Sequence, residues 1–437
     1  MLFLTAYSKS LEMYSLFIDG HIPGHLVVVL VNGRHLKMTY LLLYAALISV
    51  IRAYDYDYDN FQKCRTESDE YTDEMYLECY CEDRENITLH PIYDSEITRI
   101  TIKGCGAVRV PFSALNNLQL QELEFIDLNK LTILPFALSS VHGVSVLKIA
   151  DVADLEIIQH GFVGVHNIDR LIISNVTVNT LTKEAFNSVT NVNMFVVEDC
   201  TFREVQQLAF SLHNVTNLMI NNSEFYFLQD YSFLIHNSEK VIFEHCLFHQ
   251  TENGSFILSF VDSVYFKSCH FKDIATTAFH SNVLSNFSIT DSIIEDLQPE
   301  AFGNLVIQDK ITFKNNSVSI TYETSLDPLL TPYYNLSVDY CCNSFTCDCN
   351  IFWLWEMKNS DENNILENSK CIGDSTQTLD LYKPIMDSYN NCMTLELKSS
   401  QTMQFFDVSK PVISFGSSLI FSIRTLITTF VMIKLLS

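Results

Sequence analysis

The chain has 437 residues and a formal net charge of −25, from 27 basic and 52 acidic side chains. An acidic excess of this size repels phosphate backbones and anionic headgroups, so the composition argues against a nucleic-acid-binding protein. Hydrophobic residues make up 48% of the chain and charged residues 18%, which is typical of a chain that folds and excludes general disorder.

The first apolar segment runs from Met38 to Ala53. It follows the basic residue Lys37 and ends at a small residue, which is the layout of a signal peptide, and it is too short to cross a bilayer. We therefore expect a signal peptide at 38–53, an upstream extension without a structural role at 1–37, and a natural start at Met38 in place of Met1.

Cysteines and glycosylation triplets indicate an oxidising compartment. Thirteen cysteines gather near the two ends of the chain, and eight Asn-x-Ser/Thr triplets are spread between them. The triplets begin at Asn86, Asn175, Asn214, Asn221, Asn253, Asn286, Asn315 and Asn335. We expect secretion or cell-surface exposure, with N-glycans at these positions and disulfides near the ends.

A phenylalanine recurs at nearly regular intervals through the middle of the chain. Its positions are Phe112, Phe136, Phe162, Phe186, Phe210, Phe233, Phe256, Phe279 and Phe302. Apolar residues precede each one at fixed offsets, as in Val192, Phe195 and Val197, and the last two alternate like one face of a short strand. A unit of this size cannot bury its apolar face alone, so the units must stack as a solenoid.

These columns resemble the extracellular leucine-rich-repeat family, with Ile, Val and Phe in place of most leucines. The family spacing, Leu-x-x-Leu-x-Leu-x-x-Asn/Cys-x-Leu, matches the columns over residues 97–340. The resemblance implies an α/β solenoid of about eleven coils with a parallel sheet on its concave face.

The cysteine clusters resemble the family's end caps, which cover the open ends of such a stack. The caps would span residues 54–96 and 341–398, with Trp353 closing the core at the second end. The resemblance implies the pairs Cys64–Cys81, Cys79–Cys105, Cys347–Cys371 and Cys349–Cys392. Spacing alone leaves three ways to pair the first four cysteines.

Residues 399–437 form a polar spacer followed by an apolar segment from about Val412 to Leu436. Three interpretations compete: a lipid-anchor signal, a spanning helix and a tail packed on the protein. A spanning helix would hold Arg424 inside the bilayer at a cost of about 2.5–3.5 kcal/mol. We favour the lipid anchor, so the tail would attach the protein to a membrane.

Two groups of side chains could carry chemistry. The first offers zinc-type ligands: His245, Cys246, His249, Cys269 and His270. The repeat places its two cysteines in an inward column of small residues, where a thiol acts as a small hydrophobe. The second is the acidic pair Glu295 and Asp296, which we expect in a solvated turn. With no phosphate loop or nucleophile elbow, we expect no cofactor, no metal and no catalytic site.

An apolar ribbon is expected on the outer face of the strands. It consists of Ile172, Val196, Met219, Ile242 and Tyr265. Such a surface marks a partner-binding site, although cross-strand packing is the alternative interpretation. We expect a non-catalytic recognition or adhesion protein that binds an extracellular or cell-surface protein through this concave face. The alternatives are a soluble secreted immune-recognition or carrier subunit, and a parallel β-helix polysaccharide-active enzyme.

Overall fold

The computed structural model describes residues 13–16, 28–31, 64–68, 74–81, 83–92, 95–327, 329–330, 336–347, 351, 353–354 and 369–372. The chain forms two compact units, Met1–Gln62 and Lys63–Ser437. In the first unit, β1 (Met13–Leu16) pairs antiparallel with β2 (Val28–Val31). The expected signal peptide and the hydrophobic tail lie outside the described residues. Within the described part of the chain, no helix has the length and apolar character needed to cross a membrane.

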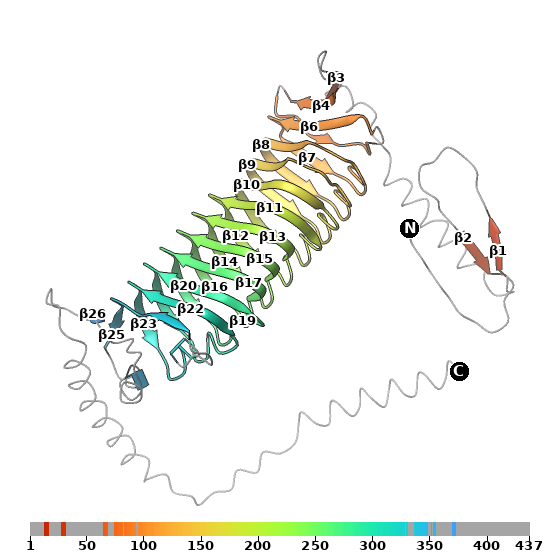
Figure 1. Cartoon of the computed structure of the whole chain (residues 1–437). Coiled ribbons are helices and arrows are strands. Elements are labelled where there is room, and N and C mark those ends of the chain that lie inside the picture. The colour runs from red at the N-terminus through yellow and green to blue at the C-terminus, as the bar shows by residue number, and fades with distance from the viewer. Residues whose placement is uncertain are drawn as a thin grey trace, which may run out of the picture. The chain divides into compact units, whose positions relative to one another are not determined.

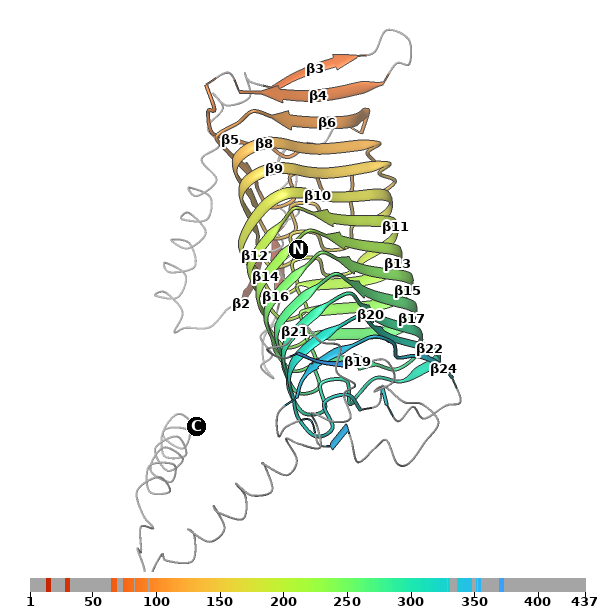
Figure 2. The same cartoon turned by 90° about the vertical axis from the view of Figure 1, so that its left-hand side faces the viewer.

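The second unit is a stack of three-sided coils, each lying parallel on the next (Figures 1 and 2). One side forms the long sheet, the next forms the short sheet, and the third side carries most of the phenylalanine column. The long sheet contains β4 (Met75–Tyr80), β6 (Ile97–Lys103), β8 (Glu122–Ile133), β9 (Val146–Ile157), β10 (His166–Leu181), β11 (Val189–Glu198), β13 (Phe210–Asn221), β15 (Phe233–Glu244), β17 (Phe256–Lys267), β20 (Leu284–Thr290), β22 (Ile307–Lys314) and β24 (Ser337–Asp339).

The short sheet is built from shorter strands and from the ends of three long ones. It contains β5 (Ile87–Thr88), β7 (Ala107–Val110), β12 (Thr201–Val205), β14 (Glu224–Leu228), β16 (Leu247–Thr251), β18 (His270–Ile274), β21 (Ile293–Leu297), β23 (Ser317–Thr321), β25 (Ser344–Thr346) and β26 (Lys370–Ile372). The C-terminal ends of β8, β9 and β10 complete it. On the third side lies β19 (Phe279–Ser281), beside the first residues of β17.

Single residues with a left-handed backbone turn the chain at the corners. Between the long and short sheets these residues are Asp151, Asn175, Asp199, Asn222, His245, Ser268, Asp291 and Asn315, with φ from 47° to 55°. Asn167, Asn191, Asn214 and Asn237 take the corner before the long sheet. Asn and Asp tolerate this conformation because their short polar side chains bond locally. The second group forms a ladder, in which the Nδ2 atoms of Asn191, Asn214 and Asn237 donate to the Oδ1 of the asparagine one coil earlier at 2.6–3.1 Å.

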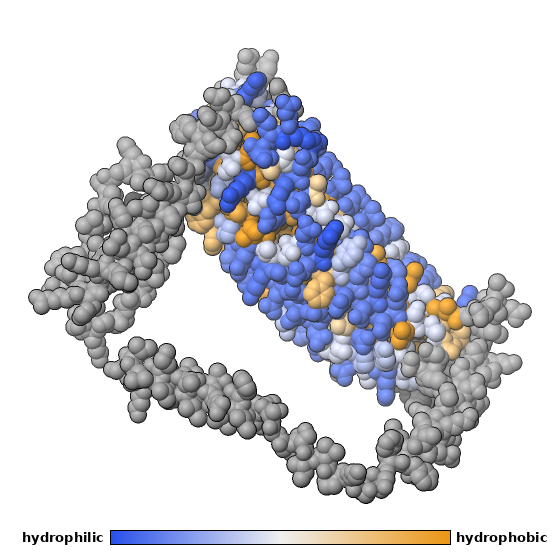
Figure 3. Space-filling view, turned by 180° about the vertical axis from the view of Figure 1, so that it is seen from behind, coloured by the Kyte–Doolittle hydropathy of each residue, from blue (hydrophilic) through white to orange (hydrophobic). Residues whose placement is uncertain are grey.

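Stacked aromatic rings fill the core. Phe186, Phe210, Phe233, Phe256 and Phe279 are fully buried, and their ring centroids lie 4.6–5.4 Å apart from coil to coil. A second stack under the short sheet comprises Phe202, Phe225, Phe248 and Phe271. Burying a phenylalanine contributes up to about 3 kcal/mol, so these stacks account for much of the cohesion between coils. The outside is mostly hydrophilic in the view of Figure 3, with scattered apolar residues.

The core column begins with leucines and not with the first two phenylalanines. Phe112 and Phe136 are 45% and 37% exposed, whereas Leu115 and Leu138 are fully buried. Backbone hydrogen bonds place these leucines in line with Phe162, which begins the buried phenylalanine stack. The alignment of Phe136 with Phe162 was therefore wrong, because Leu138 is the residue that enters the core.

The coil is not the expected α/β unit. From residue 95 to residue 327 the chain contains no α-helix, and two parallel sheets replace the single concave one. The reason is the corner chemistry: one left-handed residue bends an extended chain sharply, so a coil of this length closes with strands and turns alone. In the sequence, each of these left-handed corner residues comes directly before a residue of the inward column of small side chains. Asp199 precedes Cys200, and His245 precedes Cys246.

The N-terminal disulfides differ from the pairing that the family resemblance implied. Cys64 is bonded to Cys79 and Cys81 to Cys105, in place of Cys64–Cys81 and Cys79–Cys105. The topology explains the difference, because β3 (Cys64–Ser68) pairs antiparallel with β4 and puts Cys64 directly opposite Cys79. The Cys81 N–H then bonds the carbonyl of Lys103, which brings Cys81 beside the coil that holds Cys105.

At the other end, Cys347 is bonded to Cys371, and Cys341 to its neighbour Cys342. The strand β26 pairs with β25, so that Cys371 lies beside Phe345 at the end of the short sheet. The remaining predicted pair, Cys349–Cys392, lies outside the described residues. Trp353 is partly buried and packs against the core.

Candidate functional site

The five residues predicted to bind a partner lie side by side on the outer face of the long sheet. Their Cα register runs Ile172, Val196, Met219, Ile242 and Tyr265, one residue per coil. Met219 is 37% exposed, and the other four are half-buried. The ammonium group of Lys240 lies 5.5 Å from the centroid of the Tyr265 ring. Binding of a protein partner at this ribbon stays a prediction.

The predicted glycosylation sites differ in the availability of their amides. The Nδ2 atoms of Asn175, Asn214 and Asn315 donate to oxygens of the preceding coil at 2.8–3.1 Å. Asn253 lies at a turn and makes no such side-chain bond in the described part of the chain. Asn335 lies outside the described residues. A glycan on any of these three asparagines would replace an intercoil hydrogen bond, so Asn253 is the more accessible acceptor.

The histidines and cysteines that resemble zinc ligands do not converge. Cys246 and Cys269 are free thiols buried in the core, and burial raises the pKa of the Cys269 thiol well above its usual value. His249 and His270 lie on the outer face of the short sheet. The described residues contain no group of three or more His, Cys, Asp or Glu side chains placed to hold a metal ion.

A row of hydrogen-bonded side chains crosses the outer face of the short sheet. The Nε2 of His249 lies 2.7 Å from Oε1 of Glu224, and its Nδ1 lies 3.1 Å from the Lys272 ammonium. A charged lysine can only donate, so Nδ1 accepts and the proton of a neutral imidazole resides on Nε2. Tyr226 is 43% exposed and stacks on the His249 ring at 4.2 Å. This arrangement fixes an aromatic platform beside charged groups.

Two aspartates lie opposite each other beside this row of side chains. Asp273 in β18 is directly opposite Asp296 in β21, and adjacent strands lie about 4.8 Å apart. Each has a buried Oδ1 without a hydrogen-bond partner among the residues that the structure describes. Burial raises the pKa of Asp273; burial and the charge of Asp273 raise the pKa of Asp296; Gln298 opposes both shifts. The expectation that Asp296 lies in a solvated turn was wrong, because it is a half-buried strand residue.

Repulsion between these aspartates makes the second carboxyl harder to ionise, so as the pH falls one carboxyl takes up a proton while the other is still ionised. Such a pair provides a proton donor and a nucleophile or base at the same place. The sequence carried one usable signal for it, because Asp273 and Asp296 are separated by a single repeat period. Neither position alone differs from an ordinary surface acid.

Residues 185–328 match the family model described as a right handed beta helix region. The solenoid is a right-handed parallel β-helix. This match overturns the leucine-rich-repeat identification and the recognition function that was inferred from it. β-Helix domains are typical of carbohydrate-active enzymes and adhesins, and the matched region contains both Asp273 and Asp296. No curated protein matches the chain.

Proposed function

We propose that this protein is an extracellular polysaccharide-active β-helix that binds a glycan along the outer face of the short sheet and cleaves it at Asp273 and Asp296. The register of these two carboxyls, directly opposite each other on adjacent strands with both pKa values raised, carries the proposal. The β-helix match over residues 185–328 supports it.

The pair suits glycosidic bond cleavage with retention of configuration. Enzymes of that type hold their two carboxyls about 5–5.5 Å apart, and strands about 4.8 Å apart give a comparable separation. Asp296, whose pKa is raised by burial and by Asp273, would protonate the leaving oxygen. Ionised Asp273 would attack the anomeric carbon as the glycosidic bond breaks. Water, deprotonated by Asp296, would then hydrolyse the glycosyl ester.

The neighbouring side chains would bind the polymer. The exposed ring of Tyr226 offers an apolar platform to a sugar ring, and its stacking on His249 holds it in place. Glu224 shares β14 with Tyr226, and Lys272 shares β18 with Asp273, so both can bond sugar hydroxyls. A linear glycan laid across successive coils would meet these groups in order.

A place in the secretory pathway is part of the proposal. The described disulfides Cys81–Cys105 and Cys347–Cys371 support it, because such bonds persist in oxidising compartments and are rare in the cytosol.

The test is incubation of the purified full chain with neutral, acidic and amino polysaccharides, followed by measurement of new reducing ends. We expect cleavage of one class, with a loss of at least about a hundredfold in D273N and D296N, as for removal of a catalytic acid or base. D309N is the matched control, because Asp309 is an exposed acid on β22. Binding without cleavage would refute the catalytic role of the pair, and absence of both would refute the proposed function.

A further inference from the structure

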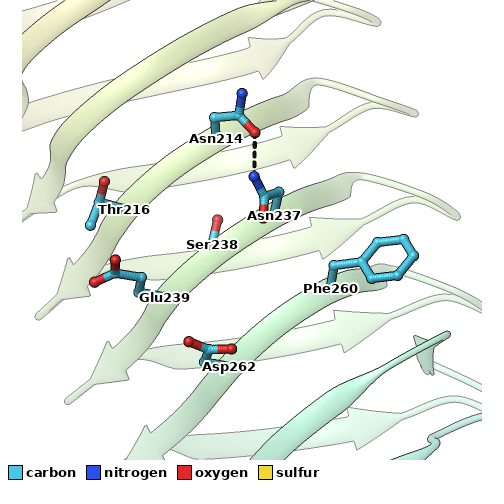
Figure 4. Close-up of a pocket in the computed structure, with 7 residues that line it drawn as sticks. All are labelled: Asn214, Thr216, Asn237, Ser238, Glu239, Phe260 and Asp262. Carbon is cyan, nitrogen blue, oxygen red and sulfur yellow. Dashed lines mark hydrogen bonds between the residues drawn. The ribbon is translucent and has the colours of Figure 1, made fainter.

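A polar depression of about 180 Å³ lies at the corner before the long sheet, where β13, β15 and β17 bend. Figure 4 shows the side chains that line it: Asn214, Thr216, Asn237, Ser238, Glu239, Phe260 and Asp262. All but Phe260 carry side-chain oxygens. None of them belongs to the short-sheet site.

The asparagine ladder ends in this depression. Asn237 donates its Nδ2 to Oδ1 of Asn214 at 2.6 Å, which uses the amide nitrogen. In the next coil the corner residue is Phe260, with φ 55°, and not another asparagine. The Oδ1 of Asn237 therefore receives no amide donor from that coil. At the last rung of the ladder, the Oδ1 of Asn237 is therefore an acceptor that no intercoil amide occupies.

Ser238 carries a buried hydroxyl. It is 5% exposed, and its Oγ makes no hydrogen bond within the described part of the chain. Its register neighbour one coil later is Val261, and the corresponding residue one coil earlier is Val215, both buried. An unsatisfied buried polar group costs about 1–3 kcal/mol, so a serine is unfavourable here unless something bonds it. Figure 4 draws Ser238 among the side chains that line the depression.

Two carboxylates complete the group. Glu239 and Asp262 are exposed, stand one coil apart, and neither forms an ion pair among the described residues. The nearest basic residue in sequence, Lys240, has its ammonium group over the Tyr265 ring. The depression thus combines uncompensated negative charge with neutral oxygen acceptors, while both of its amide nitrogens are already engaged in the ladder.

We infer that this corner depression is a Ca²⁺ site. Ca²⁺ is a hard cation that takes six to eight oxygen ligands from carboxylates, amide carbonyls and water. Glu239 and Asp262 would supply the charge, and Asn237 Oδ1 and Ser238 Oγ would supply neutral oxygens. With two carboxylates, the affinity belongs to the weak extracellular range, with a Kd of about 10⁻⁴–10⁻³ M.

The ion would act as the missing rung of the ladder. Glu239 belongs to β15 and Asp262 to β17, so one Ca²⁺ bound to both would join the two coils where no asparagine pair does. Its binding would also satisfy the Ser238 hydroxyl. Ca²⁺ would therefore stabilise the stack at the point where the polar corner changes to Phe260.

The test is calorimetric titration of the full chain with CaCl₂ at near-physiological ionic strength. We expect one saturable site in the stated range, weakened at least tenfold in E239Q and D262N and unchanged in D309N. D309N removes the same charge from another surface, so it controls for general attraction of cations to an acidic protein. Far-ultraviolet circular dichroism checks that every variant is folded.

A second variant separates ligand loss from charge loss. S238V restores the valine of the neighbouring coils, so it should raise the Tm without Ca²⁺ and reduce the rise in Tm that Ca²⁺ produces. No saturable Ca²⁺ binding, or equal weakening in D262N and D309N, would overturn the assignment. Binding of a methyl glycoside in place of Ca²⁺, lost in F260A, would also overturn it and assign the depression to a sugar.

Discussion

Replacement of Asp273 by asparagine should stabilise the protein at neutral pH while it abolishes cleavage. Both aspartates of the pair have raised pKa values, which means that folding disfavours their charged forms. For an acid with a raised folded pKa, the stabilisation is present below the unfolded pKa and is lost as pH rises through the folded pKa. At pH 7 the wild-type protein has lost this stabilisation. The D273N variant carries one negative charge fewer at the pair, so it avoids the repulsion.

The magnitude follows from the spacing. Two unit charges about 5 Å apart repel by about 3 kcal/mol at an effective dielectric constant of 20, and by about 1 kcal/mol near that of water. Asp273 and Asp296 are half-buried, so solvent screens much of the repulsion and we expect about 1–2 kcal/mol. For a chain of this size that gain corresponds to a Tm rise of about 1–2 °C. The new amide can also donate to the buried Oδ1 of Asp296.

Thermal unfolding between pH 3 and pH 8 measures this effect in wild type, D273N, D296N and the control D309N. The gain in D273N should be largest at pH 7 and should vanish at the acid end, where the wild-type carboxyls are protonated. D309N should show no comparable gain. A lower Tm for D273N at pH 7, or a gain of equal size at pH 3 and pH 7, would refute the reasoning about the pair.

Two other predictions address the stack and its glycans. Phe256→Ala should lower the free energy of unfolding in urea by about 3–5 kcal/mol, because Phe256 is fully buried between neighbouring rings. Phe260 is 53% exposed, so Phe260→Ala should lower it by less than about 0.5 kcal/mol. Similar losses in the two variants would contradict the stacked core. Asn253→Gln should remove one glycan by mass. Asn175→Gln should leave the mass of the glycans unchanged and lower the Tm by removing the bond to Asp151. Loss of a glycan in Asn175→Gln would show that this intercoil bond does not protect the asparagine from glycosylation.

The repeat and most of the core could be predicted from the sequence. The alternation of Phe195 and Val197 and the recurrence of Phe186, Phe210 and Phe233 are local patterns, and all five side chains are buried in the structure. Hydrophobic spacing determines burial because each coil must cover its apolar face with the next one. The solenoid itself followed from this period alone.

The shape of the coil could not be predicted in the same way. Whether one repeat closes with a helix or with three strands depends on single backbone conformations at corner residues such as Asn191 and Asp199, and their residue types permit those conformations without requiring them. The exchange of Phe136 for Leu138 in the core has the same origin, because a small shift of register in one coil leaves the apolar pattern almost unchanged.

The candidate sites belong wholly to the tertiary structure. Asp273 and Asp296 meet because β18 and β21 are in register, and their raised pKa values come from the burial and the proximity that this register produces. Ser238 is an ordinary polar residue in the sequence and becomes an unsatisfied hydroxyl only when its coil is stacked between Val215 and Val261. The sequence by itself determined that coils of one period would stack and which side chains would face inward, because hydrophobic spacing is a local property. Only the stacked structure decided which polar groups meet, because their contacts join residues a full coil apart.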